Sequence, residues 1–193
     1  LVWGAPTTFD EFNGLYISDG GTVTTPSLVV SNGNLVALLG GTLDTAETIV
    51  NNGLVFPVGV GADTATLHLN GGTHLFANGL QVTSNAFLTG CGIINGTVVV
   101  NAGGTVNVGT GCSLTFTGNV TNNGTIFTNS GSTIIFQGTF VNNGTIGTNT
   151  SLPPACSTVI NGNIVNLVEP GPPSFTPYTI TDGANFAEFN WSL

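Results

Sequence analysis

The sequence predicts an all-β chain that folds as a parallel β-helix, a β-solenoid with coils of about 20 residues and capped ends. Three observations predict this fold class: a near-identical internal repeat, many short strand-like segments, and a body almost without charge. Together they favour a stack of similar coils over a set of independently packed strands.

The repeat lies in the second half of the chain, where residues 111 to 126 match residues 131 to 146 at a shift of 20. The two segments are GCSLTFTGNVTNNGTI and GSTIIFQGTFVNNGTI, which share the whole of NNGTI. Weaker copies lie upstream: GGTLD at 40 to 44, NNGLV at 51 to 55, GGTHLF at 71 to 76, INGTVVV at 94 to 100 and GGTVNV at 103 to 108. A solenoid repeats in sequence, whereas the hairpin-linked strands of a sandwich or barrel need not, so the repeat favours the solenoid.

The segments between turn residues are four to six residues long and rich in Val, Ile, Thr and Phe, with Asn-Gly or Gly-Gly pairs between them. No window has the i, i+3, i+4, i+7 pattern of an amphipathic helix. The residues from Thr22 to Val168 are enough for roughly seven such coils, which would stack about 4.8 Å apart. Stacking also predicts Asn ladders between equivalent turns and glycines that supply a positive φ at the corners.

Three parts are expected along the chain. Residues 1 to 21 form an N-terminal cap with Trp3, Phe9, Phe12 and Tyr16, and residues 22 to 168 form the solenoid body. Residues 169 to 193 form a Pro-rich linker and a terminal strand segment. Because an open solenoid end is an unpaired sheet edge, this segment either caps its own chain or adds to a neighbouring molecule.

Charge excludes several classes of function. The chain has no Lys or Arg and nine acids, none of them between residues 64 and 168. Nucleic-acid binding, electrostatic docking on anionic lipid, and lysine or arginine chemistry are therefore not expected. Since no apolar run approaches the roughly 18 residues that span a bilayer, membrane insertion is not expected either.

The localisation expected is outside the cell. The chain begins at Leu1, has no Met, and shows no basic segment followed by an apolar stretch, which is typical of a processed, secreted chain. The spacing between Cys91 and Cys112 is close to one coil, so they are candidates for a disulfide, with two reduced buried thiols as the alternative. Cys156 is left over, and no CxxC pair indicates zinc or redox chemistry.

Catalytic and metal sites are not expected. Hydrolysis of a glycosidic bond needs two facing carboxylates, and only Asp44, Glu47 and Asp63 are available in the body, where they are interpreted as solvated loop acids. His68 and His74, separated by a Gly-Gly turn, are interpreted as outward-facing strand residues rather than metal ligands. No cofactor is predicted, although the N-terminal acids offer one calcium alternative. These acids are Asp10, Glu11 and Asp19.

Six N-x-[ST] sequons are candidate glycosylation sites. They begin at Asn95, Asn119, Asn123, Asn143, Asn149 and Asn190. Asn-Gly-Thr is also favourable in solenoid turns, so structure alone explains the pattern.

The stretch LTGCGIINGTVVVNAGGTVNVGTGCSLTFTGNVTNNGTI, residues 88 to 126, resembles the repeats of autotransporter-type passenger domains and related bacterial surface proteins. The resemblance covers about residues 40 to 150. It implies a right-handed parallel β-helix exported to the cell surface. Because the chain is short for that family, a small free-standing or polymerising relative is expected.

The function expected is that of an extracellular structural protein, a non-catalytic surface or filament subunit that assembles with itself head to tail. The alternative is a monomeric adhesive module that binds glycan, ice or another surface ligand through Thr-rich faces, such as residues 22 to 25 or 65 to 69. A regular Thr-x-Thr row would favour the alternative, and Thr-x-Thr does not recur in register in the sequence.

Overall fold

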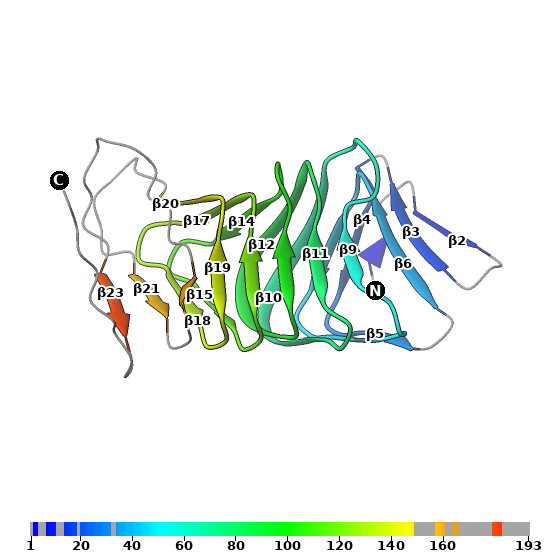
Figure 1. The fold of residues 1–193 in the computed structure, drawn as a ribbon. Coiled ribbons are helices and arrows are strands. Elements are labelled where there is room, and N and C mark those ends of the chain that lie inside the picture. The colour runs from blue at the N-terminus through cyan, green and yellow to red at the C-terminus, as the bar shows by residue number, and fades with distance from the viewer. Residues whose placement is uncertain are drawn as a thin grey trace.

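The computed structural model describes the backbone of residues 2–3, 7–10, 14–18, 20–31, 34–148, 157–160, 164–165 and 179–182, and side chains only between residues 14 and 147. Every regular element in this part of the chain is a β-strand. The predicted fold class is confirmed, because parallel strands stack about 20 residues apart into a β-solenoid of about seven turns (Figure 1). The described residues contain no helix long and apolar enough to cross a membrane.

Each turn contributes one strand to each of three faces, called here faces A, B and C. Face A is formed by two sheets. The first holds β3 (Gly14–Ser18) and β6 (Leu35–Leu39), and the second holds β9 (Phe56–Val58), β11 (Leu80–Val82), β13 (Val98–Val100), β16 (Val120–Asn122), β19 (Phe140–Asn142) and β22 (Ile164–Val165). Face B is formed by β4 (Thr22–Thr25), β7 (Thr42–Thr45), the first halves of β10 (Ala65–Phe76) and β12 (Ala86–Asn95), β14 (Thr105–Val108), β17 (Thr125–Thr128) and β20 (Thr145–Thr148). Face C is formed by β5 (Leu28–Ser31), β8 (Thr48–Asn51), the second halves of β10 and β12, β15 (Ser113–Phe116), β18 (Thr133–Phe136), β21 (Ser157–Ile160) and β23 (Thr179–Asp182).

The turns are numbered in chain order. Turn 1 holds β3 to β5, turn 2 β6 to β8, turn 3 β9 and β10, turn 4 β11 and β12, turn 5 β13 to β15, turn 6 β16 to β18, and turn 7 β19 to β21. On face B the sequence step is the same from turn 5 to turn 6 and from turn 6 to turn 7, since Thr105 pairs with Thr125 and Thr125 with Thr145. The step from Thr42 to its partner Thr66 is longer, because an extra loop joins β9 to β10 in turn 3.

The core is built by the inward side chains of these strands, because successive residues of a strand point to opposite faces of the sheet. Equivalent inward positions stack along the solenoid, as in the face B ladder Val23, Leu43, Leu67, Leu88, Val106 and Ile126. All six of these side chains have no exposed surface. In turns 5 to 7 the phenyl rings stack as well. The ring centroids of Phe116 and Phe136 are 5.4 Å apart, and those of Phe136 and Phe140 are 4.0 Å apart.

Glycines at two corners are required by close approach of the neighbouring turn rather than by a positive φ. A Cβ on Gly124 would overlap the carbonyl oxygens of Asn101 and Gly104, and one on Gly138 would overlap the carbonyl of Gly118. Neither Gly124 nor Gly138 has a positive φ. The prediction that corner glycines supply a positive φ is therefore right at others, such as Gly111 with φ of 69°, but wrong at these two.

The predicted Asn ladders are present where the NNGTI segments stack. Asn122 is fully buried and donates from Nδ2 to Asn142 Oδ1 at 2.7 Å, while its Oδ1 accepts from the backbone N of Gly124 at 3.1 Å. The outward Asn143 donates from Nδ2 to Asn123 Oδ1 at 3.0 Å. Each NN pair thus holds the corner of its own turn and joins it to the next.

The two ends of the described solenoid differ. At the N-terminal end β1 (Val2–Trp3) pairs antiparallel with β4 on face B, and β2 (Thr7–Asp10) pairs antiparallel with β3 on face A. β3 itself pairs in parallel with β6, as the first face A strand of the stack. At the other end β23 pairs in parallel with β21 of its own chain, so residues 179 to 182 continue face C by one strand. The domain boundaries at residues 21 and 168 stay predictions.

Candidate functional site

The outer surface of face B carries a row of threonines, one from each turn but one. On each face B strand, the residue directly before the buried ladder residue points outward, and these outward residues pair with one another from turn to turn. From turn 1 to turn 7 it is occupied by Thr22, Thr42, Thr66, Phe87, Thr105, Thr125 and Thr145. Because parallel strands are about 4.8 Å apart, the threonines of this row follow one another at about that spacing, with one gap at Phe87.

A second outward row lies two residues further along each face B strand, and it is not uniform. From turn 1 to turn 7 it is occupied by Thr24, Asp44, His68, Thr89, Asn107, Phe127 and Gly147. The prediction that Thr-x-Thr does not recur in register is therefore correct. The single threonine row was missed because the dipeptide Gly-Thr, which begins most face B strands, also occurs at other corners, such as residues 96–97.

Polar contacts organise the second row in its first turns. The Nδ1 atom of His68 lies 2.8 Å from Thr89 Oγ1, and Asn70 Nδ2 donates to Asp44 Oδ1 at 3.0 Å. In turns 4 to 7 neither row has an ionisable side chain. Face B therefore changes from a polar, acid-bearing surface to a neutral one along the solenoid.

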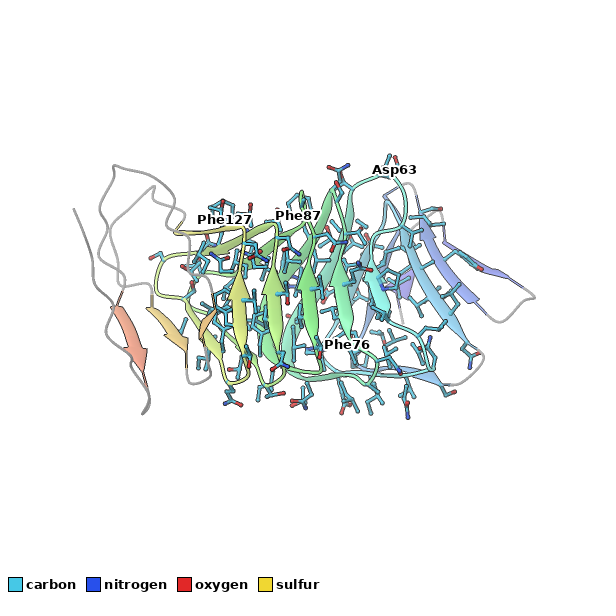
Figure 2. The ribbon with its side chains drawn as sticks, in the orientation of Figure 1. Asp63, Phe76, Phe87 and Phe127 are labelled. Atoms are coloured by element: carbon cyan, nitrogen blue, oxygen red, sulfur yellow. A yellow bond between two sulfur atoms is a disulfide. The ribbon has the colours of Figure 1, made fainter. Side chains whose placement is uncertain are left out.

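Two phenyl rings, Phe87 and Phe127, lie on the neutral part of face B, on the same side of the solenoid (Figure 2). Both are half-buried. The ring of Phe127 lies against the next turn at Gly147, where an added Cβ would be 3.0 Å from Cε1 of the ring. Because Gly147 has no side chain, the ring has room to lie against the sheet and shield the glycine backbone.

The two histidines lie on opposite sides of the sheet. His68 is outward on face B, whereas His74 is inward on face C with no exposed surface, so the prediction that both face outward is wrong for His74. The cause is an irregularity between Asn70 and Thr73, where β10 holds one residue more than β12 and the alternation shifts. The structure does not bring the two imidazoles together as a metal site.

His74 is held in a small buried polar network between faces B and C. Its Nε2 lies 2.8 Å from the carbonyl oxygen of Gly71, so Nε2 carries the proton, and its Nδ1 accepts from Thr48 Oγ1 at 3.1 Å. Thr45, also fully buried, donates from Oγ1 to the carbonyl of Glu47 at 2.6 Å. Burial lowers the pKa of His74 below 6.5, against the smaller opposite effects of the Gly71 hydrogen bond and the Glu47 charge.

Cys91 and Cys112 form a disulfide in the structure, with Cα atoms 5.2 Å apart. Cys91 is in β12 of turn 4, and Cys112 directly precedes β15 of turn 5. The bond therefore joins consecutive turns at the corner between faces B and C. Cys156 lies outside the described residues.

The three body acids lie at different places. Asp44 is on face B, Glu47 is exposed at the corner before β8, and Asp63 is exposed in the loop between β9 and β10 (Figure 2). Asp44 accepts from Asn70, and Glu47 accepts from Ser27 Oγ at 3.4 Å. Within the described ranges no three His, Cys, Asp or Glu side chains cluster as metal ligands would. The N-terminal calcium alternative is not tested, since Glu11 and Asp19 and the side chain of Asp10 lie outside what is described.

The sequons occupy different environments. Asn119, Asn123 and Asn143 are exposed at corners, and Asn143 uses its Nδ2, the atom that a glycan would modify, in the ladder to Asn123. Asn95 is partly buried and accepts from Thr117 Oγ1 at 2.7 Å. Asn149 and Asn190 lie outside the described residues, and glycosylation at all six positions stays a prediction.

No protein-family model matches the chain, and no match to it was found among curated proteins or solved structures. The resemblance to autotransporter passengers, and the right-handed coil it implies, therefore stay predictions. Functional inference depends on the faces, edges and charges of the solenoid itself.

Proposed function

We propose that the protein is a secreted, non-catalytic structural subunit that assembles head to tail into filaments on the cell exterior. The observation that carries the proposal is the pairing of face C at its two ends. Among the described strands β5 pairs only with β8, and β23 pairs only with β21. A parallel sheet that ends in such edges can be continued by another chain.

The edge at β5 is unprotected by the devices that usually block strand addition. Its sequence is Leu28-Val29-Val30-Ser31, without charge or proline, and the side chain of Val29 is 65% exposed. On faces A and B the first parallel strand is instead followed outward by the antiparallel β2 and β1. β23 of a second copy, added to β5 in parallel, would continue face C from one molecule to the next.

The charge distribution makes this assembly dependent on pH. Six of the nine acids lie near the ends of the chain, three before residue 20 and three after residue 168. No Lys or Arg is available anywhere in the chain to offset these acids in a head-to-tail contact between the terminal segments. Partial protonation near the isoelectric point of about 4.1 brings the net charge to zero and lowers the repulsion, so assembly is expected to be stronger there.

Two features support the extracellular location. A disulfide such as Cys91–Cys112 is typical of oxidising compartments. The chain also offers trypsin no cleavage site, since it has no Lys or Arg, which suits a protein exposed to proteases.

Negative-stain electron microscopy of the purified chain, near neutral pH and near pH 4.1, tests the proposal. The edge is tested by Val29→Pro. The backbone N–H of Leu28 donates to the carbonyl of Glu47, in the segment leading into β8. Because successive N–H groups of a strand point to opposite sides, the N–H of Val29 points to the open side of β5. A proline there removes a donor needed for strand addition but no bond to β8. Val29→Thr, which keeps the N–H, is the matched control, and thermal unfolding checks that both variants fold.

Regular filaments that are lost in Val29→Pro and kept in Val29→Thr would support the proposal. Removal of residues 170 to 193, which include β23, should abolish the filaments too. Uniformly dispersed short rods at both pH values would reject the subunit role and favour the second candidate, a monomeric binding module. That candidate is favoured by one specific observation, the threonine row of face B.

A further inference from the structure

We propose that the part of face B in turns 4 to 7 is a binding site for a neutral polysaccharide. The juxtaposition that carries the inference is an outward threonine row interrupted by Phe87, beside a second row that contains Phe127. This site does not depend on assembly, because face B runs along the side of the solenoid and remains open in a head-to-tail filament.

The hydroxyl groups of the row are available to a ligand. Thr105 and Thr125 are partly exposed, and neither side chain makes a hydrogen bond to another described residue. Their spacing of about 4.8 Å follows from strand pairing. A ligand that presents hydroxyl groups at regular intervals can therefore contact several turns at once, which adds up weak individual hydrogen bonds.

The phenyl rings supply the second component. Sugar rings carry an apolar face of C–H groups, which packs against aromatic rings, together with hydroxyls around the edge. Phe87 and Phe127 are separated by two strand spacings and two residues along the strand, about 12 Å between Cα positions. Both lie on one sheet surface (Figure 2), so an extended chain of sugars can contact both rings and the threonines between them.

Charge and shape decide between the classes of ligand. The outward positions of turns 4 to 7 on face B carry no ionisable side chain, so an anionic or cationic polymer gains no ion pair there. Ice would be best matched by a flat row of small side chains on both positions, whereas Phe87 and Phe127 interrupt both rows. A neutral polysaccharide satisfies both the hydroxyls and the rings.

The test is co-sedimentation of the full chain with three insoluble neutral polysaccharides: cellulose, chitin and a β-1,3-glucan. The double variant Phe87→Thr with Phe127→Asn removes the rings and uses residues that occupy the same rows in neighbouring turns, Thr105 and Asn107. Ile93→Thr with Ile135→Thr is the matched control on face C, where Thr115 occupies the same position between them. Thr105→Val with Thr125→Val removes hydroxyls and keeps side-chain shape.

Binding of the wild-type chain to at least one of these polymers is expected, with an affinity about tenfold lower in the ring variant and unchanged in the face C control. The valine variant should be weaker than the wild type as well. Failure to bind any of the three polymers, or an equal loss in the face C control, would overturn the proposal. Inhibition of ice growth without polysaccharide binding would assign face B to ice instead. Chain that sediments without polymer is counted as filament and subtracted, so the two proposals fail separately.

Discussion

Turns 5 to 7 and turns 1 to 3 stack in the same way but are held together by different side chains. In turns 5 to 7 like residues stack on like: Phe116 on Phe136, and Asn122 on Asn142. In turns 1 to 3 some inward positions instead hold unlike residues, such as Leu28, Thr48 and His74 along one position of face C. Near-identical turns therefore gain ladders of side chains that continue from turn to turn, whereas dissimilar turns need contacts that are satisfied separately in each turn.

The largest expected effect comes from the phenyl stack. Phe136→Ala should lower the free energy of unfolding by about 3–5 kcal/mol, the usual range for a buried aromatic ring. The ring stacks on both Phe116 and Phe140, whereas Phe76 in turn 3 has one ring partner among the described residues, Phe56, with ring centroids 5.4 Å apart. Urea unfolding of Phe76→Ala should therefore show a loss smaller by about 1 kcal/mol. An equal or larger loss in Phe76→Ala would mean that ladder stacking adds nothing.

The disulfide joins turn 5 to turn 4, which lies between the two regions, and its removal should have the next largest effect. The bonded cysteines have a sequence separation of 21, so replacing both by Ala should cost about 3 kcal/mol of unfolding free energy in the chain-entropy account. Urea unfolding with and without a reducing agent measures this. The wild type should fall to the value of the double variant when reduced, and the variant itself should not respond. A reductant-insensitive wild type would contradict the bond.

A smaller effect is expected at the buried Asn ladder. Asn142→Val leaves one N–H of Asn122 Nδ2 without its acceptor at 2.7 Å, and an unpaired buried donor costs about 1–3 kcal/mol. Valine is already present at the equivalent position of turn 5, as Val100. The double variant Asn122→Val with Asn142→Val should therefore cost less than the sum of the two single variants. Strict additivity in a double-mutant cycle would indicate that the two amides act independently.

The smallest effect, and the one that is specific to turns 1 to 3, is the pH dependence contributed by His74. Its folded pKa is lowered, so below pH 6.5 the unfolded chain binds more protons than the folded one. The contribution of neutral His74 to the free energy of unfolding is full above pH 6.5, and it is lost as the pH falls from 6.5 toward the lowered folded pKa. His74→Ile, which copies Ile94 of the next turn, should remove this part of the pH dependence of unfolding. His68→Thr, the control at the outward histidine, should retain it.

The fold could be predicted most accurately where the sequence repeats. The NNGTI copies at residues 122 to 126 and 142 to 146 fix both the constant step and the stacked amides. Prediction failed where one residue changes the alternation, since nothing in LNGGTH shows that the Gly-Gly corner holds an extra residue and turns His74 inward. Besides the ambiguity of Gly-Thr, the threonine row was hidden by the irregular sequence spacing between Thr42 and Thr66, because register across the long loop of turn 3 depends on three-dimensional pairing.

The constant step of turns 5 to 7 has a consequence for how such a chain can evolve. Residues 105 to 124 contain one strand for each face and end at a corner glycine, so a tandem duplication of this window inserts one whole turn and leaves every other register unchanged. The solenoid would lengthen by about 4.8 Å, and the hydroxyl row of face B would gain one member. Replication slippage alone can therefore change the length of the solenoid, without any new core sequence.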